Sequence, residues 1–390
     1  MKKVISNIMF GLVYVLCFFT PLVFSSLTKE NYEFPKMFFV YFLGATIIFL
    51  FLLTFDTWRL KFKIPNRFVL LFLISIVVAT LTSNHVYTSL WGYHSRQNGG
   101  LISYLVFFGI YFVALNTFSK QTKRRVVDVF LLALLPICLH GLLQIGSMPR
   151  VVSTFGQPNW LAAYIVILLP MLFLRIVDNE QKYLWLTILT LSTAVLVFTG
   201  SLSGVLGAVI SLGYLGFQYR KNIPKYVYAL LLLGFVLNFN FIKQRFHDAL
   251  TFSIAPEDYQ VSDSNLIRYG LWKGSLRLFV SSPKNILVGV GPENFTYEYP
   301  FFREDVLNYS SEWNYIMNKP HNYYLEVLVE QGIFGFVPYV LLLGWSLRSK
   351  DKFLTASFLG FYVTNIFSWP TVATSLVFWM FLVLREDTFQ

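Results

Sequence analysis

The sequence predicts an all-α integral membrane protein with about twelve transmembrane helices and one large extracytoplasmic loop. Of its 390 residues, 56% are hydrophobic and only 13% are charged, whereas charged residues make up about 25% of a typical soluble domain. Apolar runs of roughly 17 to 20 residues recur, each long enough to cross a hydrocarbon core about 30 Å thick. The runs do not alternate between apolar and polar residues, so they predict helices rather than the strands of a barrel.

Twelve runs are predicted to span the membrane: 4–26, 36–54, 67–83, 100–118, 126–147, 159–177, 183–200, 202–219, 224–240, 333–347, 353–369 and 371–386. The stretch after Met1-Lys2-Lys3 is longer than the apolar core of a typical signal peptide and lacks a clean cleavage site. It is therefore assigned to the first span. Cys17 and Cys138 lie within apolar runs and are expected to be free, buried thiols.

The basic residues predict the orientation of these spans, because cytoplasmic connections are enriched in lysine and arginine. With both termini inside, every basic cluster falls on the cytoplasmic side. These clusters are Lys2 and Lys3; Arg59, Lys61, Lys63 and Arg67; Lys120, Lys123, Arg124 and Arg125; Arg220, Lys221 and Lys225; and Arg348, Lys350 and Lys352. This alternation explains most of the net charge of +11, so no nucleic-acid partner is expected.

The remaining connections fall outside the cytoplasm, and one of them, 241–332, is by far the longest. We therefore expect a membrane domain of nine spans over 1–240, an extracytoplasmic loop over 241–332 that carries the functional site, and a membrane domain of three spans over 333–390. The shorter outer connections are 27–35, 84–99 and 148–158.

Within the long loop, residues 264–280 read SNLIRYGLWKGSLRLFV and are predicted to form a helix. Successive residues of a helix turn by about 100°, which places Arg268 on the same face as Trp272. Lys273 and Arg277 point roughly the opposite way. An arginine on an aromatic face near lipid either extends its charge past that face to water or binds a ligand there.

A second unusual segment, NKPHNYYLEVLVEQGIFGF over 318–336, contains one of only five histidines. Asn318 or Lys319 is expected to cap a helix, with Pro320 in its first turn. On that helix His321 would share an apolar face with Leu325, either as a packed core residue or as a functional group. A separate polar stripe would hold Asn322, Glu326 and Glu330.

These two segments resemble the O-antigen ligase/polymerase superfamily, whose membrane architecture is GT-C-like. LIRYGLWKGSLRLFVSSPKNILVGVGPENF and HNYYLEVLVEQGIFGF follow its R-x3-W…P-x-x-G-x-G-x-x-x-F and H-N-x-x-L-x5-G-x-x-G patterns. The residues in register are Arg268, Trp272, Pro283, Gly289, Gly291, Phe295, His321, Asn322, Leu325, Gly332 and Gly335. Upstream, NYEFPK (31–36), SLWGYHSRQNGG (89–100), GLLQIGSMP (141–149) and STFGQPNWLAAY (153–164) are also similar to family segments.

The resemblance implies transfer of a glycan from an undecaprenyl-pyrophosphate carrier to a hydroxyl acceptor, at the outer face of the bacterial cytoplasmic membrane. It also implies an inverting reaction without a metal or other cofactor. Arginine suits a diphosphate because its planar guanidinium binds such groups with two parallel hydrogen bonds. Arg268 is therefore expected to hold the diphosphate, and His321 to be the general base for the acceptor hydroxyl. Trp272 and Asn322 are expected to bind substrate.

One departure from the family pattern concerns the segment TGSLSG, where Leu202 stands in place of an expected arginine. Arg96 and Arg150, on the same predicted side, are candidates to supply the missing cation, and each could instead be an ordinary surface residue. Asn159 either caps the sixth span or helps to bind the donor. Asp-x-Asp and His-x-x-x-His spacings are absent from the sequence, and no metal ligands are assigned.

The sequence does not identify the acceptor, because a lipid, a glycan or a protein hydroxyl would each fit. A polymerase of lipid-linked oligosaccharide repeats and a protein O-oligosaccharyltransferase are therefore alternatives to a ligase. A polysaccharide or lipid transporter is the alternative from a different class. Transporters usually carry ionisable residues near the middle of the membrane, whereas these spans have almost none there, which favours an enzyme.

Overall fold

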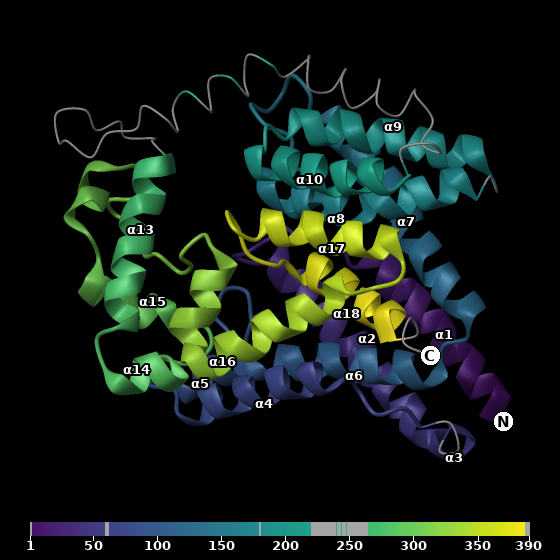
Figure 1. Ribbon diagram of the computed structural model, residues 1–390, viewed down its shortest axis with the longest axis horizontal. Helices are drawn as coiled ribbons and strands as arrows, with labels where there is room; N and C mark the ends of the chain where they lie inside the picture. The colour runs from purple at the N-terminus through teal and green to yellow at the C-terminus, as the bar shows by residue number, and fades with distance from the viewer. Residues whose placement is uncertain are drawn as a thin grey trace.

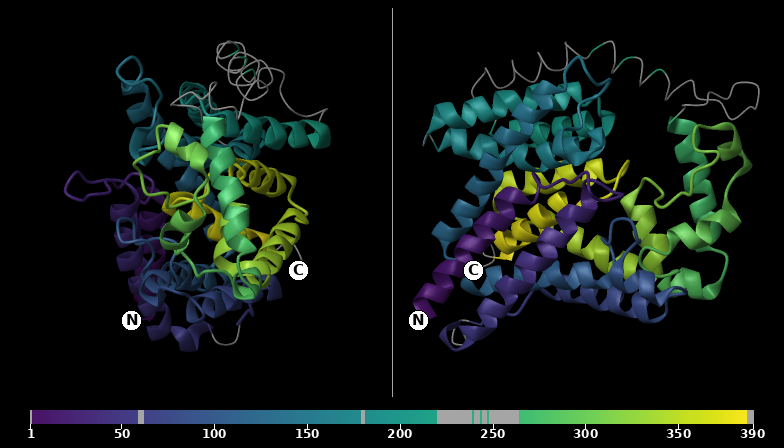
Figure 2. Two further views of the ribbon diagram at one scale, coloured as in Figure 1. Left: turned by 90° about the vertical axis from the view of Figure 1, so that its left-hand side faces the viewer. Right: turned by 180° about the vertical axis from the view of Figure 1, so that it is seen from behind.

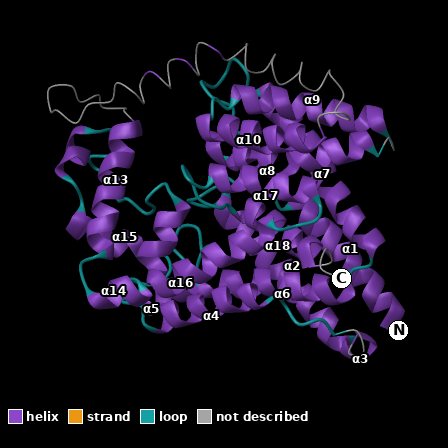
Figure 3. Ribbon diagram, in the orientation of Figure 1, coloured by secondary structure: helices purple, strands orange, loops and turns teal. Residues whose placement is uncertain are grey.

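The structure is a computed structural model that describes residues 2–58, 62–178, 181–219 and 264–386, together with residues 239, 243 and 247. Helices and the loops between them make up this part of the chain, which contains no named β-strand (Figure 3). The all-α class is therefore confirmed for the described residues.

Eleven described helices coincide with predicted spans. They are α1 (Lys2–Phe19), α2 (Glu33–Leu53), α4 (Arg67–Leu81), α6 (Leu101–Thr117), α7 (Lys120–Leu143), α8 (Pro158–Val177), α9 (Lys182–Phe198), α10 (Leu202–Tyr219), α16 (Tyr323–Leu347), α17 (Lys352–Thr364) and α18 (Val372–Glu386). Six of them, α1, α2, α7, α8, α10 and α16, are long and apolar enough to cross a membrane, and α4, α6 and α9 are shorter apolar helices. A multi-pass membrane protein is supported, whereas the total of twelve spans stays a prediction. The expected span 224–240 lies almost wholly outside the described residues.

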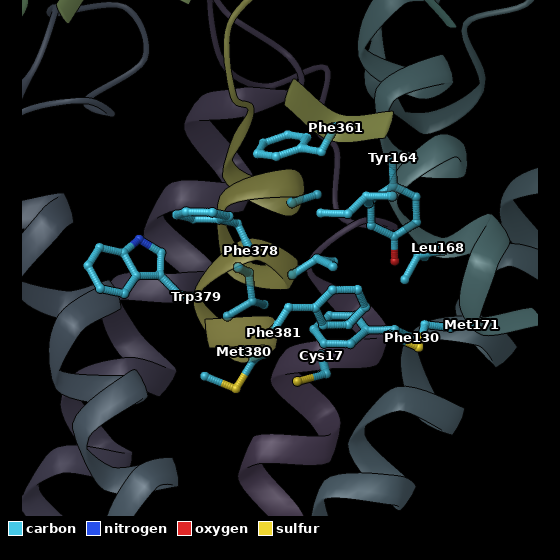
Figure 4. Packing of buried hydrophobic residues seen from close by; sticks show 14 of the residues in the cluster. Cys17, Phe130, Tyr164, Leu168, Met171, Phe361, Phe378, Trp379, Met380 and Phe381 are labelled. Carbon is cyan, nitrogen blue, oxygen red and sulfur yellow. The ribbon is translucent and has the colours of Figure 1, made fainter. Parts of the chain in front are cut away.

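Helix α8 forms the centre of the bundle. Of the 18 most apolar consecutive residues of α8, 89% are buried inside the protein, whereas the corresponding share for α1 is 22%. Helix α8 packs against α17, α9, α10 and α7. A helix that is hydrophobic on every side belongs in such a core. Figure 4 shows Tyr164, Leu168 and Met171 of α8 facing Phe361 of α17 and Phe381 of α18. Cys17 and Cys138 are free and buried, as predicted.

The two ends of the bundle differ. The described part of the predicted loop includes α13 (Ser264–Phe279), α14 (Pro283–Val288), α15 (Phe295–Glu298) and two short 3-10 helices at Tyr299–Phe302 and Asp305–Tyr309. Helices α13 to α15 project from one end of the bundle, and both chain termini lie at the other end (Figures 1 and 2). Three further short elements are α3 (Phe55–Trp58), α5 (Val86–Trp91) and a 3-10 turn at Ser153–Phe155.

Helix α16 begins at Tyr323, well before the predicted start of its span at 333, and it is broken at Gly332, where φ is 62°. The loop 289–291 packs into this break: the Val290 N–H donates to the Val329 carbonyl at 3.1 Å and the Gly291 N–H to the Glu330 carbonyl at 2.9 Å. A Cβ at Gly332 would overlap backbone atoms of the facing segment. The glycines of the two sequence patterns therefore allow those two segments to meet.

Candidate functional site

His321 lies at the end of the bundle from which α13 projects, immediately before α16. The expected cap was wrong: Asn322 caps α16, with its side-chain oxygen accepting from the Leu325 N–H at 3.1 Å. His321 is thus outside the helix, with a left-handed backbone φ of 55°, and shares no helical face with Leu325. A non-glycine residue in this region is uncommon and strained, so the surrounding structure must hold it there.

Three backbone contacts hold the segment on both sides of His321. On one side, the indole Nε1 of Trp272 on α13 donates to the Pro320 carbonyl at 3.0 Å. On the other, the Tyr323 N–H donates to the carbonyls of Asn365 at 2.9 Å and Ser368 at 3.1 Å. Trp272 therefore acts on the histidine turn through its indole N–H.

Lys319, two residues before His321, is buried among carboxylates that the sequence reasoning did not assign to the site. Its ammonium pairs with Glu293 and, at 2.6 Å, with Glu326. Glu330 lies beside them, and one oxygen from each of the three carboxylates falls within 4.8 Å of the others. Burial alone would lower the pKa of Lys319, but the carboxylates of Glu293, Glu326 and Glu330 outweigh it and raise the pKa, so this lysine stays charged.

Two arginines and a tryptophan surround the His321 ring. The imidazole packs edge-on against Trp369, with ring centroids 5.0 Å apart. The Arg96 guanidinium lies over Trp369 at 5.4 Å and over Trp160 at 5.5 Å. Burial, then the charges of Arg268 and Arg96, lower the pKa of His321 to about 4. At neutral pH the ring is therefore uncharged and able to accept a proton.

The two faces of α13 differ as the helical spacing predicts. Arg268 lies over the Phe367 ring at 5.9 Å, on the side from which Trp272 contacts Pro320. On the opposite side, Lys273 and Arg277 each pair with Glu304 at 2.7 Å. Only Arg268 of these three cations faces the histidine turn.

Arg150 lies elsewhere, at the turn before Leu202. Its Nε donates to the Thr199 carbonyl at 2.7 Å, and its Nη2 contacts the Gly200 carbonyl at 3.2 Å and Asn159 Oδ1 at 3.3 Å. The same amide oxygen accepts from the Ser201 hydroxyl at 2.8 Å. Arg150 and Asn159 thus organise the TGSLSG turn. Of the two candidates to replace an arginine at Leu202, Arg96 contacts Trp369, which packs against the His321 ring.

A cavity opens beside Lys319 and Tyr323, among helices α4, α6, α16, α17 and α18 and the connection 96–99, with Glu33 of α2 in its wall. Its lining includes Glu33, Arg96, Asn98, Glu326 and Trp369. The Glu33 Oε2 atom accepts from the Val372 N–H at 2.8 Å. Segments from both halves of the chain therefore build one wall around the site.

Residues 186–340 match the O-antigen ligase family. This stretch of the chain is similar to an O-antigen ligase domain. This match confirms the resemblance to the O-antigen ligase/polymerase superfamily that the sequence segments predicted. A search of the curated proteins finds no match. The matched range includes Arg268, Trp272, His321 and Asn322 and crosses both expected domain boundaries, at 240 and at 332.

The O-antigen ligase domain suggests a glycosyltransferase-like ligase or polymerase, and it implies lipid-linked glycan substrates and membrane lipids as partners. Arg96, Glu33 and Trp369 of the site lie outside the matched range. The site therefore combines the domain with segments that precede and follow it.

Three contributors to the site, Lys319, Glu293 and Glu33, were missed by sequence reasoning. The sequence pattern indicated Lys319 only as a possible helix cap and assigned no role to Glu293 or Glu33. The available signal was a lysine directly before Pro-His and two glutamates, Glu326 and Glu330, one helical turn apart on an otherwise apolar segment. Buried carboxylates need a counter-charge, so that pattern indicates a buried ion pair.

Proposed function

We propose that this protein transfers a glycan from an undecaprenyl-pyrophosphate carrier to a hydroxyl acceptor at the outer face of the bacterial cytoplasmic membrane. His321 is the general base, Arg268 and Arg96 hold the diphosphate, and Trp272 and Asn322 fix the histidine turn. The observation that carries the proposal is one buried, uncharged histidine packed against Trp369, whose pKa is lowered first by burial and then by the charges of two arginines from different segments. That combination joins a proton acceptor to an anion-binding site.

In the proposed reaction, His321 removes the proton from the acceptor hydroxyl. The oxygen then attacks the anomeric carbon, and the bond between that carbon and the diphosphate oxygen breaks. Arginines stabilise the negative charge that develops on the leaving diphosphate. Attack from the face opposite the leaving group inverts the anomeric centre, and no covalent enzyme intermediate is needed.

The arginines also couple donor binding to the base. A pKa of about 4 makes free His321 a weak base, and general bases work best when their pKa lies near the working pH. A bound diphosphate would offset the positive charges of Arg268 and Arg96 and so raise the histidine pKa above its value in the free protein, while the effect of burial remains. The base would thereby gain strength when the donor is in place.

Metal-independent transfer is part of the proposal. Three carboxylates, Glu293, Glu326 and Glu330, lie close enough together to ligate a cation, but the Lys319 ammonium already pairs with two of them. With that charge in place, and with arginines for the diphosphate, the reaction needs no divalent ion. Purified protein should keep its transfer activity in excess EDTA. Loss of activity in EDTA and recovery with Mg²⁺ would overturn this part of the proposal.

The decisive experiment is a deletion strain in which lipid-linked glycan is resolved by chain length. A missing ligase leaves long polymer on the carrier, whereas a missing polymerase leaves single repeat units. An unchanged glycan profile would contradict the proposed function. A ligase phenotype with a modified protein as the lost product would identify a protein acceptor.

A further inference from the structure

Three segments that meet around His321 each contain a residue with a strained backbone. Among the described residues other than glycine, five have a positive φ, and three of these are Gln97 at 47°, Glu293 at 60° and His321 at 55°. Gln97 directly follows Arg96, and Glu293 follows the loop 289–291 that packs on α16. Such conformations persist only where surrounding contacts hold them, and they cluster at functional sites. Contacts among these three segments must therefore keep them in place.

Lys319 connects the three segments. It precedes His321 by two residues, and its ammonium pairs with the Glu293 carboxylate. The backbone of Gly99 lies directly against the same carboxylate, because a Cβ at Gly99 would overlap Glu293 Oε1. Gly99 belongs to the connection that carries Arg96. The carboxylate is thus held between the histidine turn on one side and the arginine connection on the other.

A second link joins the same two segments on the other side of His321. Tyr323, two residues after the histidine, shares a hydrogen bond with Tyr104 at 2.9 Å between their hydroxyl oxygens. Tyr104 lies near the start of α6, which follows directly on the connection that carries Arg96. Residues on both sides of the histidine therefore contact one continuous segment, 96–104.

The charged link is a costly way to join two segments if stability is all that it provides. Lys319, Glu293 and Glu326 are each only 5% exposed, and the removal of charges from water is offset only when their pairing geometry is good. Apolar residues of similar volume often stabilise a fold at least as well. Charge-assisted hydrogen bonds are short and directional, however, so they set the distance between the segments that they join.

We propose that Lys319 and Tyr323 are positioning residues that hold the segment 96–104 in register with the His321 turn. The proposed base and one proposed diphosphate-binding arginine, Arg96, lie far apart in the sequence, so only tertiary contacts can set their separation. A misplacement of about 1 Å can lower an enzymatic rate by a large factor. The inference rests on the proposed function, because only a reaction that uses both side chains requires this register.

The test follows His321 directly and does not depend on catalysis. Full-length protein with 13C-labelled histidine is titrated by NMR in lipid nanodiscs, and the His321 signal is identified by its loss in His321→Ala. Glu293→Asn introduces a residue that tolerates the left-handed backbone, but its side chain is shorter and uncharged and should no longer hold Lys319. The turn should then move away from the Arg96 charge.

The sign of the shift separates movement from the change in charge. Loss of the negative charge of Glu293 would by itself lower the midpoint of the His321 titration, whereas movement of the turn away from Arg96 raises it. We expect the midpoint in Glu293→Asn to rise by about half a unit or more. Transfer per folded molecule should fall by about tenfold or more.

Two further variants and a control separate positioning from folding. Glu293→Gln keeps the side-chain length and an oxygen that accepts from Lys319, so its transfer should stay within about threefold of the wild-type rate. Tyr104→Phe removes only a hydroxyl group, and it should raise the midpoint in the same direction with a smaller loss of transfer than Glu293→Asn. Glu312→Asn, in the loop after the 3-10 helix Asp305–Tyr309, is the matched control and should change neither quantity.

An unchanged His321 titration in both Glu293→Asn and Tyr104→Phe would overturn the assignment, whatever their stability. A loss of transfer in Glu293→Asn without a rise in the midpoint would also overturn it, because the effect would then not pass through the histidine turn. If Glu293→Asn does not fold, the titration of Tyr104→Phe decides. Absence of transfer by the wild-type protein would refute the proposed function, whereas the titrations would still report whether these residues hold the turn.

Discussion

The two ends of the helix bundle both contain buried or half-buried arginines, but the arginines meet different partners. At the end with the termini, Arg175 pairs with Asp128 and with Asp178 at 3.5 Å. Arg385 donates to the carbonyls of Trp345 at 3.1 Å and Arg348 at 2.9 Å. Carboxylates and carbonyls satisfy these guanidinium groups within the protein.

At the opposite end, Arg96 lies between the rings of Trp160 and Trp369. Its buried Nε has no hydrogen-bond partner among the described residues. Aromatic rings attract a guanidinium through their faces but do not satisfy its N–H groups. The comparison supports the proposal that the charges at the terminal end stabilise the fold, whereas Arg96 at the His321 end binds an anion.

Replacing the base should give the largest effect. We expect His321→Ala to lower the transfer rate about 10²–10⁴-fold, the usual contribution of a general base, while the protein still inserts and folds. His94→Ala, an exposed histidine in the 84–99 connection, serves as the control and should transfer normally. Rates are measured with purified protein and lipid-linked donor. A His321→Ala enzyme with near-normal rates would leave His321 as a packing residue.

Arginine replacements on the two faces of α13 should separate the functional face from the structural one. Arg268→Lys keeps the positive charge but loses the planar, two-pronged donor, and we expect it to lose most transfer activity. Arg277→Lys can still pair with Glu304 and should behave as the wild type. The paired measurement is transfer rate at equal amounts of folded protein. If Arg277→Lys loses transfer activity while Arg268→Lys keeps it, the assignment of the two faces is reversed.

At the terminal end, the same type of change should affect stability rather than rate. Arg175→Met leaves Asp128 without its buried partner, which we expect to lower the free energy of unfolding by about 3–5 kcal/mol. Arg124→Met removes a solvent-exposed pair with Asp178 and should cost less than about 1 kcal/mol. Unfolding in mixed micelles measures both, and transfer per folded molecule should stay within about twofold. A selective loss of transfer in Arg175→Met would remove the contrast between the ends.

The smallest expected effect is a shift in pH dependence. Because the pKa of His321 is lowered to about 4, kcat/KM should fall only as the pH drops well below the usual histidine value of about 6.5. Arg96→Gln removes one of the charges that lower this pKa, so the acid limb should move upward by up to about one unit. The pH profiles of the two proteins measure the shift. If the acid limb of the kcat/KM profile stays in place in Arg96→Gln, Arg96 does not lower the pKa of His321.

The lowered pKa of His321 also makes the free energy of unfolding depend on pH. Between about pH 6.5 and 4 the unfolded chain binds a proton at His321 that the folded protein does not. The contribution of the neutral ring is therefore fully present above about 6.5 and is lost as the pH falls toward 4. His321→Gln should flatten this part of the stability curve.

By itself, the sequence determined the helical class and the positions of the apolar helices that the structure describes, and it predicts which connections are cytoplasmic and which are outer. These features follow from local composition, since span length and charge asymmetry are written along a single run of residues. The two faces of α13 were also readable, because helical periodicity alone puts Arg268 opposite Lys273 and Arg277. The match over 186–340 confirmed the family that the motifs around Arg268 and His321 predicted.

Only the tertiary structure decided how His321 is held and what surrounds it. The expected helix through His321 failed because Trp272, far away in sequence, and the 365–368 loop fix the preceding turn instead. Arg150 and Arg96 looked equivalent in sequence, yet the first binds the carbonyls of the TGSLSG turn and the second reaches Trp369. The Glu33 carboxylate accepts a hydrogen bond from the Val372 N–H, although the two residues lie near opposite ends of the sequence. Such pairings depend on which segments pack together, and no local pattern encodes that choice.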